Sequence, residues 1–143
     1  MLSFRIILTI LACAFSGQVL AQSAEGHKGG LSVELNSVTD VGEACRLTFV
    51  VNNQTGTAID VAAFETVIFD TGGGVVTLSV FNFRDLPQDR PRVRQFDLAG
   101  MACSSVGQAL INGASSCVVN GAESEICQSA LSLRSRIDVE LLG

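Results

Sequence analysis

Four arginines between positions 84 and 94 are the residues with the clearest chemical potential in this chain. Arg84, Arg90, Arg92 and Arg94 lie in the segment R-D-L-P-Q-D-R-P-R-V-R. A guanidinium group carries a planar fork of N–H donors that fits carboxylate or phosphate. Because side chains alternate along a strand, the last three would share one face and form a positive ridge. The spacing predicts a docking site for an acidic partner, with salt bridges to neighbouring aspartates as the simpler alternative.

The same segment contains a conflict of register. Phe96 and Leu98 continue the alternation of Arg92 and Arg94, so apolar and charged side chains would share one face. Either a bulge shifts the register, or Arg94 lies at the margin of the core with a carboxylate partner. Both prolines of the chain fall within residues 84–91. Proline removes a backbone donor, so this stretch is predicted to be a loop or an edge crossing.

Enzymatic chemistry has little support in the sequence. Acid–base catalysis needs two carboxylates in contrasting environments. The only histidine, His27, lies in a polar, glycine-rich stretch, where it is a poor partner for a nucleophilic serine or cysteine. We therefore predict a non-enzymatic protein without a cofactor. The carboxylates are scattered over strand faces and turns, at Asp60, Glu65, Asp70, Asp138 and Glu140.

The first 21 residues match an export signal. A basic residue precedes an apolar run over residues 6–15, which is too short to span a bilayer. Val19-Leu20-Ala21 then supplies the small or aliphatic residues of a cleavage site, which we place between Ala21 and Gln22. A lipoprotein signal with Cys13 as the lipidated residue is the alternative. The chain is therefore predicted to be periplasmic or secreted, and no later segment is apolar enough to span a membrane.

The cysteine count supports the same compartment. Four cysteines remain when Cys13 leaves with the signal, and an even number in an exported protein indicates two disulfides rather than a zinc site. A tight hairpin at Asn112-Gly113 would hold Cys103 too far from Cys117 for a bridge. Of the connectivities that remain open, we favour Cys45–Cys103 with Cys117–Cys127.

The net charge excludes one class of partner. The chain carries a formal charge of −5, and loss of residues 1–21 removes one arginine and no acid, which leaves −6. An acidic surface disfavours nucleic acid and anionic lipid. We therefore expect a protein partner.

The elements that must position these residues are short strands. In the segment over residues 45–53, Leu47, Phe49 and Val51 alternate with more polar side chains, which is typical of a half-buried strand. Similar patterns recur between turns, and one short helix fits residues 123–133. The fold class is predicted to be all-β: an antiparallel, immunoglobulin-like sandwich of seven to nine strands. It would follow a flexible leader at 22–30 and occupy residues 31–143, with strands near 31–36, 45–53, 61–70, 75–83, 92–98, 106–111, 115–119 and 137–141.

Several segments resemble a group of small exported alphaproteobacterial proteins. They are L-N-S-V-T-D at 35–40, C-R-L-T-F-V-V-N-N at 45–53, V-I-F-D at 67–70 and D-L-P-x-x-R-P-R-V-R-Q-F-D-L at 85–98. The V-x-N-x-x-G and F-D-x-x-G spacings are also similar to sandwich modules of the FxLYD type. The resemblance implies a location in the cell envelope and no particular activity.

Two functions fit these observations. The first is a binding or structural module of the cell envelope that acts through an exposed sheet edge or through the arginines. The second is an inhibitor of an extracellular or periplasmic hydrolase that uses the loop at 84–91 as its probe. A rigid loop suits that task because little conformational entropy is lost on binding.

Overall fold

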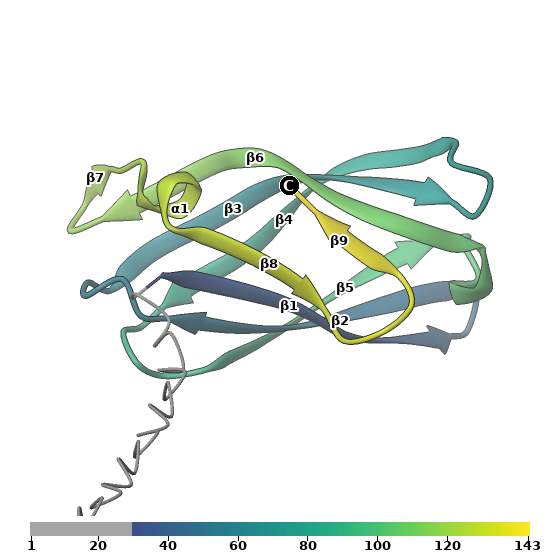
Figure 1. Cartoon of the computed structure of the whole chain (residues 1–143), viewed down its shortest axis with the longest axis horizontal. Coiled ribbons are helices and arrows are strands. Elements are labelled where there is room, and N and C mark those ends of the chain that lie inside the picture. The colour runs from purple at the N-terminus through teal and green to yellow at the C-terminus, as the bar shows by residue number, and fades with distance from the viewer. Residues whose placement is uncertain (1–29) are drawn as a thin grey trace, which may run out of the picture.

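The computed structural model describes residues 30–143, and it forms two β-sheets that face each other (Figure 1). The predicted export signal, Cys13 and His27 lie outside the described residues. The predicted all-β sandwich is confirmed, with one short α-helix. The elements are β1 (Leu31–Val41), β2 (Ala44–Asn53), β3 (Ile59–Asp70), β4 (Val75–Leu86), β5 (Arg92–Ala99), the 3-10 turn η1 (Cys103–Ser105), β6 (Val106–Val119), β7 (Ala122–Glu123), α1 (Ile126–Ser129), β8 (Leu131–Ser135) and β9 (Glu140–Leu142).

The first sheet has the strand order β5-β2-β1-β8, and the second has the order β4-β3-β6-β7 with β9 also beside β6. The prediction of a purely antiparallel sandwich is wrong, because β8 runs parallel to β1 and β9 runs parallel to β6. After α1 the chain joins the first sheet and then crosses back to the second. The yellow end of the ribbon in Figure 1 follows this path.

That crossing also corrects the predicted strand at 137–141. Only Glu140–Leu142 is paired, and residues 136–139 form a bend between the two sheets. The hydroxyl of Ser135 donates to the carbonyl oxygens of Ile137 and Val139 within this bend. Ile137 and Val139 still pack against the core, which explains why an alternating pattern is present without a ladder.

The core lies between the sheets, as the alternation predicts. Leu47, Phe49 and Val51 of β2 are buried. β3 lies between β4 and β6 and carries apolar side chains on both faces, in agreement with its prediction as a central strand. The phenylalanines predicted to be core residues form one cluster across the sheets, except Phe69, which is only half-buried. In this cluster the rings of Phe81 and Phe96 stack with their centroids 4.2 Å apart.

Both disulfides have the predicted partners, Cys45–Cys103 and Cys117–Cys127. Such bridges are typical of an oxidising compartment. The hairpin used to exclude Cys103–Cys117 is wrong, however, because Asn112-Gly113 lies inside the 14-residue strand β6. Register shifts against β3 surround this dipeptide, and the Asn112 amide donates to the Glu65 carboxylate. Cys103 and Cys117 are kept apart by the length of β6.

Candidate binding site

Arg94 lies at the open side of the sandwich, where β4 and β5 are the edge strands of the two sheets. It shares its register with Phe96 and Leu98, and its side chain is only 19% exposed. Its Nε donates to the Phe83 carbonyl oxygen at 2.5 Å, and its Nη2 donates to the Asp85 carbonyl oxygen at 3.0 Å. Of the two alternatives for the register conflict, Arg94 at the core margin is the one observed.

Asp85 is the carboxylate partner that this position requires. Its two oxygens lie 3.4 Å from Nη2 of Arg94 and 3.4 Å from Nη2 of Arg92. Burial lowers the pKa of the Arg94 guanidinium, while the charge of Asp85 opposes that change. An arginine stays protonated in either case. Arg92 and Arg94 are therefore part of the structure of this edge and not the outer surface of a ridge.

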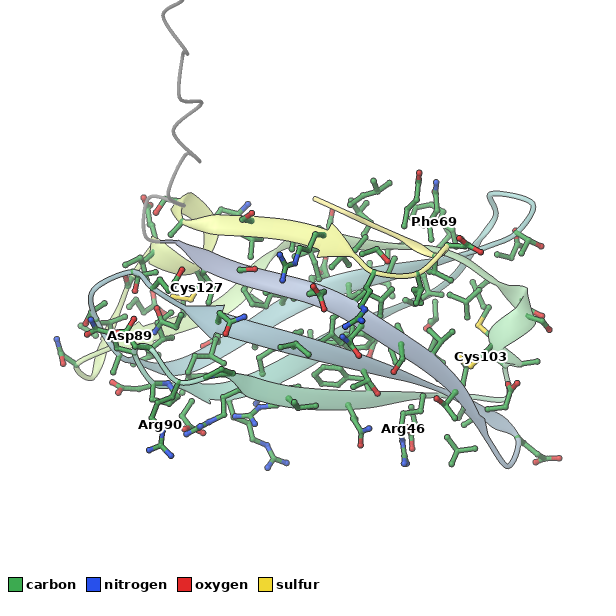
Figure 2. All side chains as sticks on the ribbon, turned by 60° about the horizontal axis from the view of Figure 1, so that its bottom comes forward. Arg46, Phe69, Asp89, Arg90, Cys103 and Cys127 are labelled. Atoms are coloured by element: carbon green, nitrogen blue, oxygen red, sulfur yellow. A yellow bond between two sulfur atoms is a disulfide. The ribbon has the colours of Figure 1, made fainter. Side chains whose placement is uncertain are left out.

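Arg84 and Arg90 are the exposed members of the arginine cluster, by which we mean Arg84, Arg90, Arg92 and Arg94. Within residues 30–143 no carboxylate lies within 4.0 Å of the charged nitrogens of Arg84 or Arg90. Arg84 has a left-handed backbone with φ of 61°, and its N–H donates to the side chain of Asn82. Figure 2 shows Arg90 near the end of the sandwich that contains Cys127, away from Cys103. The ridge of three arginines is thus divided into exposed and covered members.

Asn53 holds the end of β4 and the start of the loop after it, between Arg84 and Arg90. It is 1% exposed, and its Nδ2 donates to the carbonyl oxygens of Thr57 and Leu86. Its Oδ1 accepts hydrogen bonds from the backbone and the hydroxyl of Thr55. Its own carbonyl oxygen accepts from the Asp89 N–H at 2.8 Å. Asn53 therefore links the turn after β2 to both ends of the segment 86–89, to Leu86 through its side-chain amide and to Asp89 through its backbone carbonyl.

The open side between the edge strands is hollowed. A groove of about 660 Å³ lies beside the first half of β4, and its lining includes Thr77, Phe81 and the stretch 97–102. The neighbouring hollow shares Ser79, Phe81 and Asp97 with it. Arg46 holds Asp97 through two hydrogen bonds, and this contact lowers the pKa of the Asp97 carboxyl. The predicted sheet edge and the predicted arginines therefore lie on the same side of the molecule.

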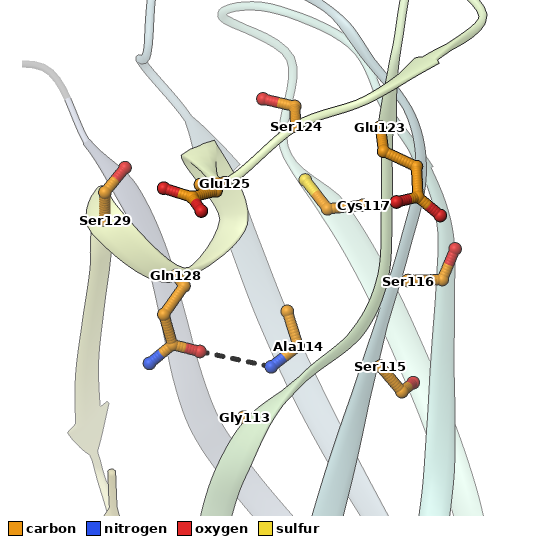
Figure 3. A pocket seen from close by; sticks show the side chains of 10 residues that line it. All are labelled: Gly113, Ala114, Ser115, Ser116, Cys117, Glu123, Ser124, Glu125, Gln128 and Ser129. Atoms are coloured by element: carbon orange, nitrogen blue, oxygen red, sulfur yellow. Dashed lines mark hydrogen bonds between the residues drawn. The ribbon is translucent and has the colours of Figure 1, made fainter.

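A second hollow of about 500 Å³ lies beside α1 (Figure 3). The Cys117–Cys127 bridge joins α1 to β6, and the Gln128 Oε1 accepts from the Ala114 N–H at 3.1 Å. The sequence pattern did not single out this hollow, because only the paired cysteines indicate that α1 folds back on β6. Its polar lining consists of Ser115, Ser116, Glu123, Ser124, Glu125, Gln128 and Ser129.

The hydroxyl, amide and carboxylate groups of this second hollow can donate or accept hydrogen bonds. A nucleophilic serine is commonly activated by an adjacent histidine, and no histidine lies within residues 30–143. Within residues 30–143 there is also no group of three metal-ligating side chains. The carboxylates singled out from the sequence are not brought together into a pair in these hollows. The arginine cluster with its pinned loop is the best-ordered candidate for a binding site.

Fold and site together define a disulfide-bonded β-sandwich with the arginine cluster at one edge. Neither a family model nor a curated protein sequence matches the chain. Among solved structures, IrmA from Escherichia coli is similar in fold, with a TM-score of 0.57 and 11% sequence identity. The alignment covers 74% of this chain and 92% of that chain. No helix in the described part of this chain is long and apolar enough to cross a membrane.

Proposed function

We propose that the protein is a non-enzymatic binding module of the cell envelope, periplasmic or secreted, that docks an acidic protein partner. The observation that carries this proposal is the pinned segment 84–91, which presents Arg84 and Arg90 without carboxylate partners within the described residues. Its first three residues are the end of β4, and only residues 87–91 form the loop to β5. Charge complementarity of this kind raises association rates and selects partners. A loop already held by Asn53 loses little entropy when it binds.

Charge reversal at the two exposed arginines tests this function. Crosslinking in the native envelope, followed by mass spectrometry, identifies the partner that wild-type protein contacts. We expect R84E/R90E to weaken that complex at least tenfold, which is about 1.4 kcal/mol. R136E is the matched control, because Arg136 is also exposed and lies in the bend between β8 and β9. A partner that binds both variants as tightly as wild type would contradict docking on the loop.

Inhibition of an envelope or extracellular hydrolase is the second candidate function. Its support is the fixed shape of the loop, in which Arg84 and Asp89 have left-handed backbones and Pro87 and Pro91 restrict the chain. The test is a panel of purified periplasmic hydrolases. Nanomolar inhibition that R84E/R90E abolishes and R136E preserves would support this function, and the absence of inhibition across the panel would remove it.

A further inference from the structure

The first half of β4 is an exposed apolar edge. Val75, Val76, Leu78 and Val80 are between 48% and 65% exposed, and they lie on the edge strand of the second sheet. No charged residue occurs from Val75 to Phe83. Natural edge strands avoid pairing with other chains by carrying charges, prolines or bulges. The other edge on this side, β5, follows that rule through Arg92, Arg94 and Asp97. β4 has register shifts against β3 between Val75 and Thr77 and again from Asn82 to Leu86, but it pairs regularly from Thr77 to Asn82.

Arg94 covers only the second half of β4. Its guanidinium occupies the carbonyl oxygens of Phe83 and Asp85, so another strand cannot pair there. Among the described residues, no side chain forms a hydrogen bond with the backbone of 75–82. Alternate N–H and C=O groups of an edge strand lack a neighbour on the open side. This half of the edge is therefore the part available for pairing.

We propose that a second copy of this chain pairs with this edge, β4 against β4, in an antiparallel dimer with its two-fold axis at Leu78. The segment Val76-Thr77-Leu78-Ser79-Val80 has the same residue classes in both directions. In this register Val76 faces Val80 of the other copy, Thr77 faces Ser79, and Leu78 faces itself. Apolar pairs and Thr–Ser pairs directly opposite one another stabilise antiparallel strands. Self-complementarity is what a two-fold interface requires.

An apolar row on the neighbouring strands continues from Leu78 across the second sheet. On the outer face of the second sheet, Leu78 lies opposite Val67, Val67 opposite Leu110, and Leu110 opposite Leu142. Pairing at Leu78 would join this apolar row to the same row of the second copy. Shifting the axis by one residue leaves Val80 opposite Gly74 or Val76 opposite Asn82, so the Leu78 register is the one that places apolar residues opposite one another at positions 76, 78 and 80. Leu78 and Val80 lie in the regularly paired part of β4, and Val76 lies at its register shift against β3.

The charges at the ends of β4 agree with the antiparallel direction. The strand follows the turn that begins at Asp70 and runs toward the arginine cluster. In the Leu78 register, the arginine-bearing end of β4 in one copy points toward the Asp70 turn of the other copy, beyond the paired stretch. Each cationic end thus lies beside an acidic turn, whereas parallel pairing would place like charges together. Charge complementarity therefore favours a second copy in this orientation.

A lysine at the proposed axis tests the dimer. We expect the purified, oxidised wild-type protein to be a dimer at micromolar concentrations in analytical ultracentrifugation, and L78K to have half that mass. V93K is the matched control, because Val93 is 57% exposed on β5, the edge strand of the first sheet. The V93K variant should remain dimeric. V80K provides a second variant if L78K does not fold. A monomeric wild type, or a dimer that L78K and V80K leave intact, overturns the proposal.

Cysteine substitutions test the register. Directly opposed residues have Cα atoms about 4.5–5.5 Å apart, within the range of a disulfide, so L78C should crosslink to itself. V76C in the two copies would be about 13 Å apart, so V76C should crosslink with V80C and not with itself. Self-crosslinking of V76C, or no crosslinking of L78C, overturns this register. Because L78K keeps all four arginines, loss of the dimer is distinguishable from loss of the partner proposed for the loop.

Discussion

At the scale of single residues, Asn53 stabilises the fold although the sequence places it in a polar turn. It is buried, and its amide makes four hydrogen bonds that hold the turn at 54–57 against Leu86. We expect N53A to lower the free energy of unfolding by roughly 2–3 kcal/mol, because buried backbone partners lose their bonds. Urea denaturation measures the change. N52A, at the neighbouring half-buried position, is the control and should remain near wild type.

Asp97 gives the protein a measurable dependence on acid. Hydrogen bonds from Arg46 lower the pKa of the Asp97 carboxyl in the folded state. The unfolded chain, with an aspartate pKa of about 3.9, therefore takes up the proton first as pH falls. The stabilisation is present above that value and is lost as pH falls through the folded pKa.

The variant D97N isolates this contribution. We expect D97N to have a lower urea midpoint than wild type at neutral pH and the same midpoint once wild-type Asp97 is protonated. D138N is the control, since Asp138 is exposed and has no ion pair within residues 30–143. A difference between D97N and wild type that is constant with pH would contradict the assignment.

At the scale of elements, the two disulfides differ in what they constrain. Cys45–Cys103 closes a loop with a sequence separation of 58, and Cys117–Cys127 closes one of 10. The chain-entropy relation gives stabilisation of about 4 and about 3 kcal/mol. We expect C45S/C103S to lower stability more than C117S/C127S in urea denaturation. The opposite order would show that α1 depends on its bridge for more than chain entropy.

The strands themselves were largely predictable, because alternation is a local signal. The buried faces of β2 and β3 follow directly from their residue types. The failures occur where tertiary structure overrides local chemistry. Asn112-Gly113 has the residues of a tight turn, yet bulges beside β3 absorb it into β6. Ile137 and Val139 alternate as in a strand, yet they belong to a bend that crosses between sheets.

The candidate site was predictable only in part, for a reason that belongs to the whole molecule. Sequence indicated the arginines and even a carboxylate partner for Arg94. It could not indicate that Arg94 of the first sheet donates to Phe83 of the second, because that contact depends on how the sheets meet. The same contact separates covered arginines from exposed ones. The functional division of the cluster is thus a property of the sandwich and not of the segment.

Arg94 links the edges of the two sheets, so its loss should affect the whole molecule in two ways. We expect R94M to lower the free energy of unfolding by roughly 1–3 kcal/mol, because the Phe83 and Asp85 carbonyls lose a charged donor. R94M also uncovers the second half of β4, and a longer unprotected edge favours aggregation. Urea denaturation and light scattering measure the two effects. R90M removes an exposed arginine nearby and should change neither. An R94M protein as stable and as soluble as R90M would show that Arg94 neither joins the sheets nor covers the edge.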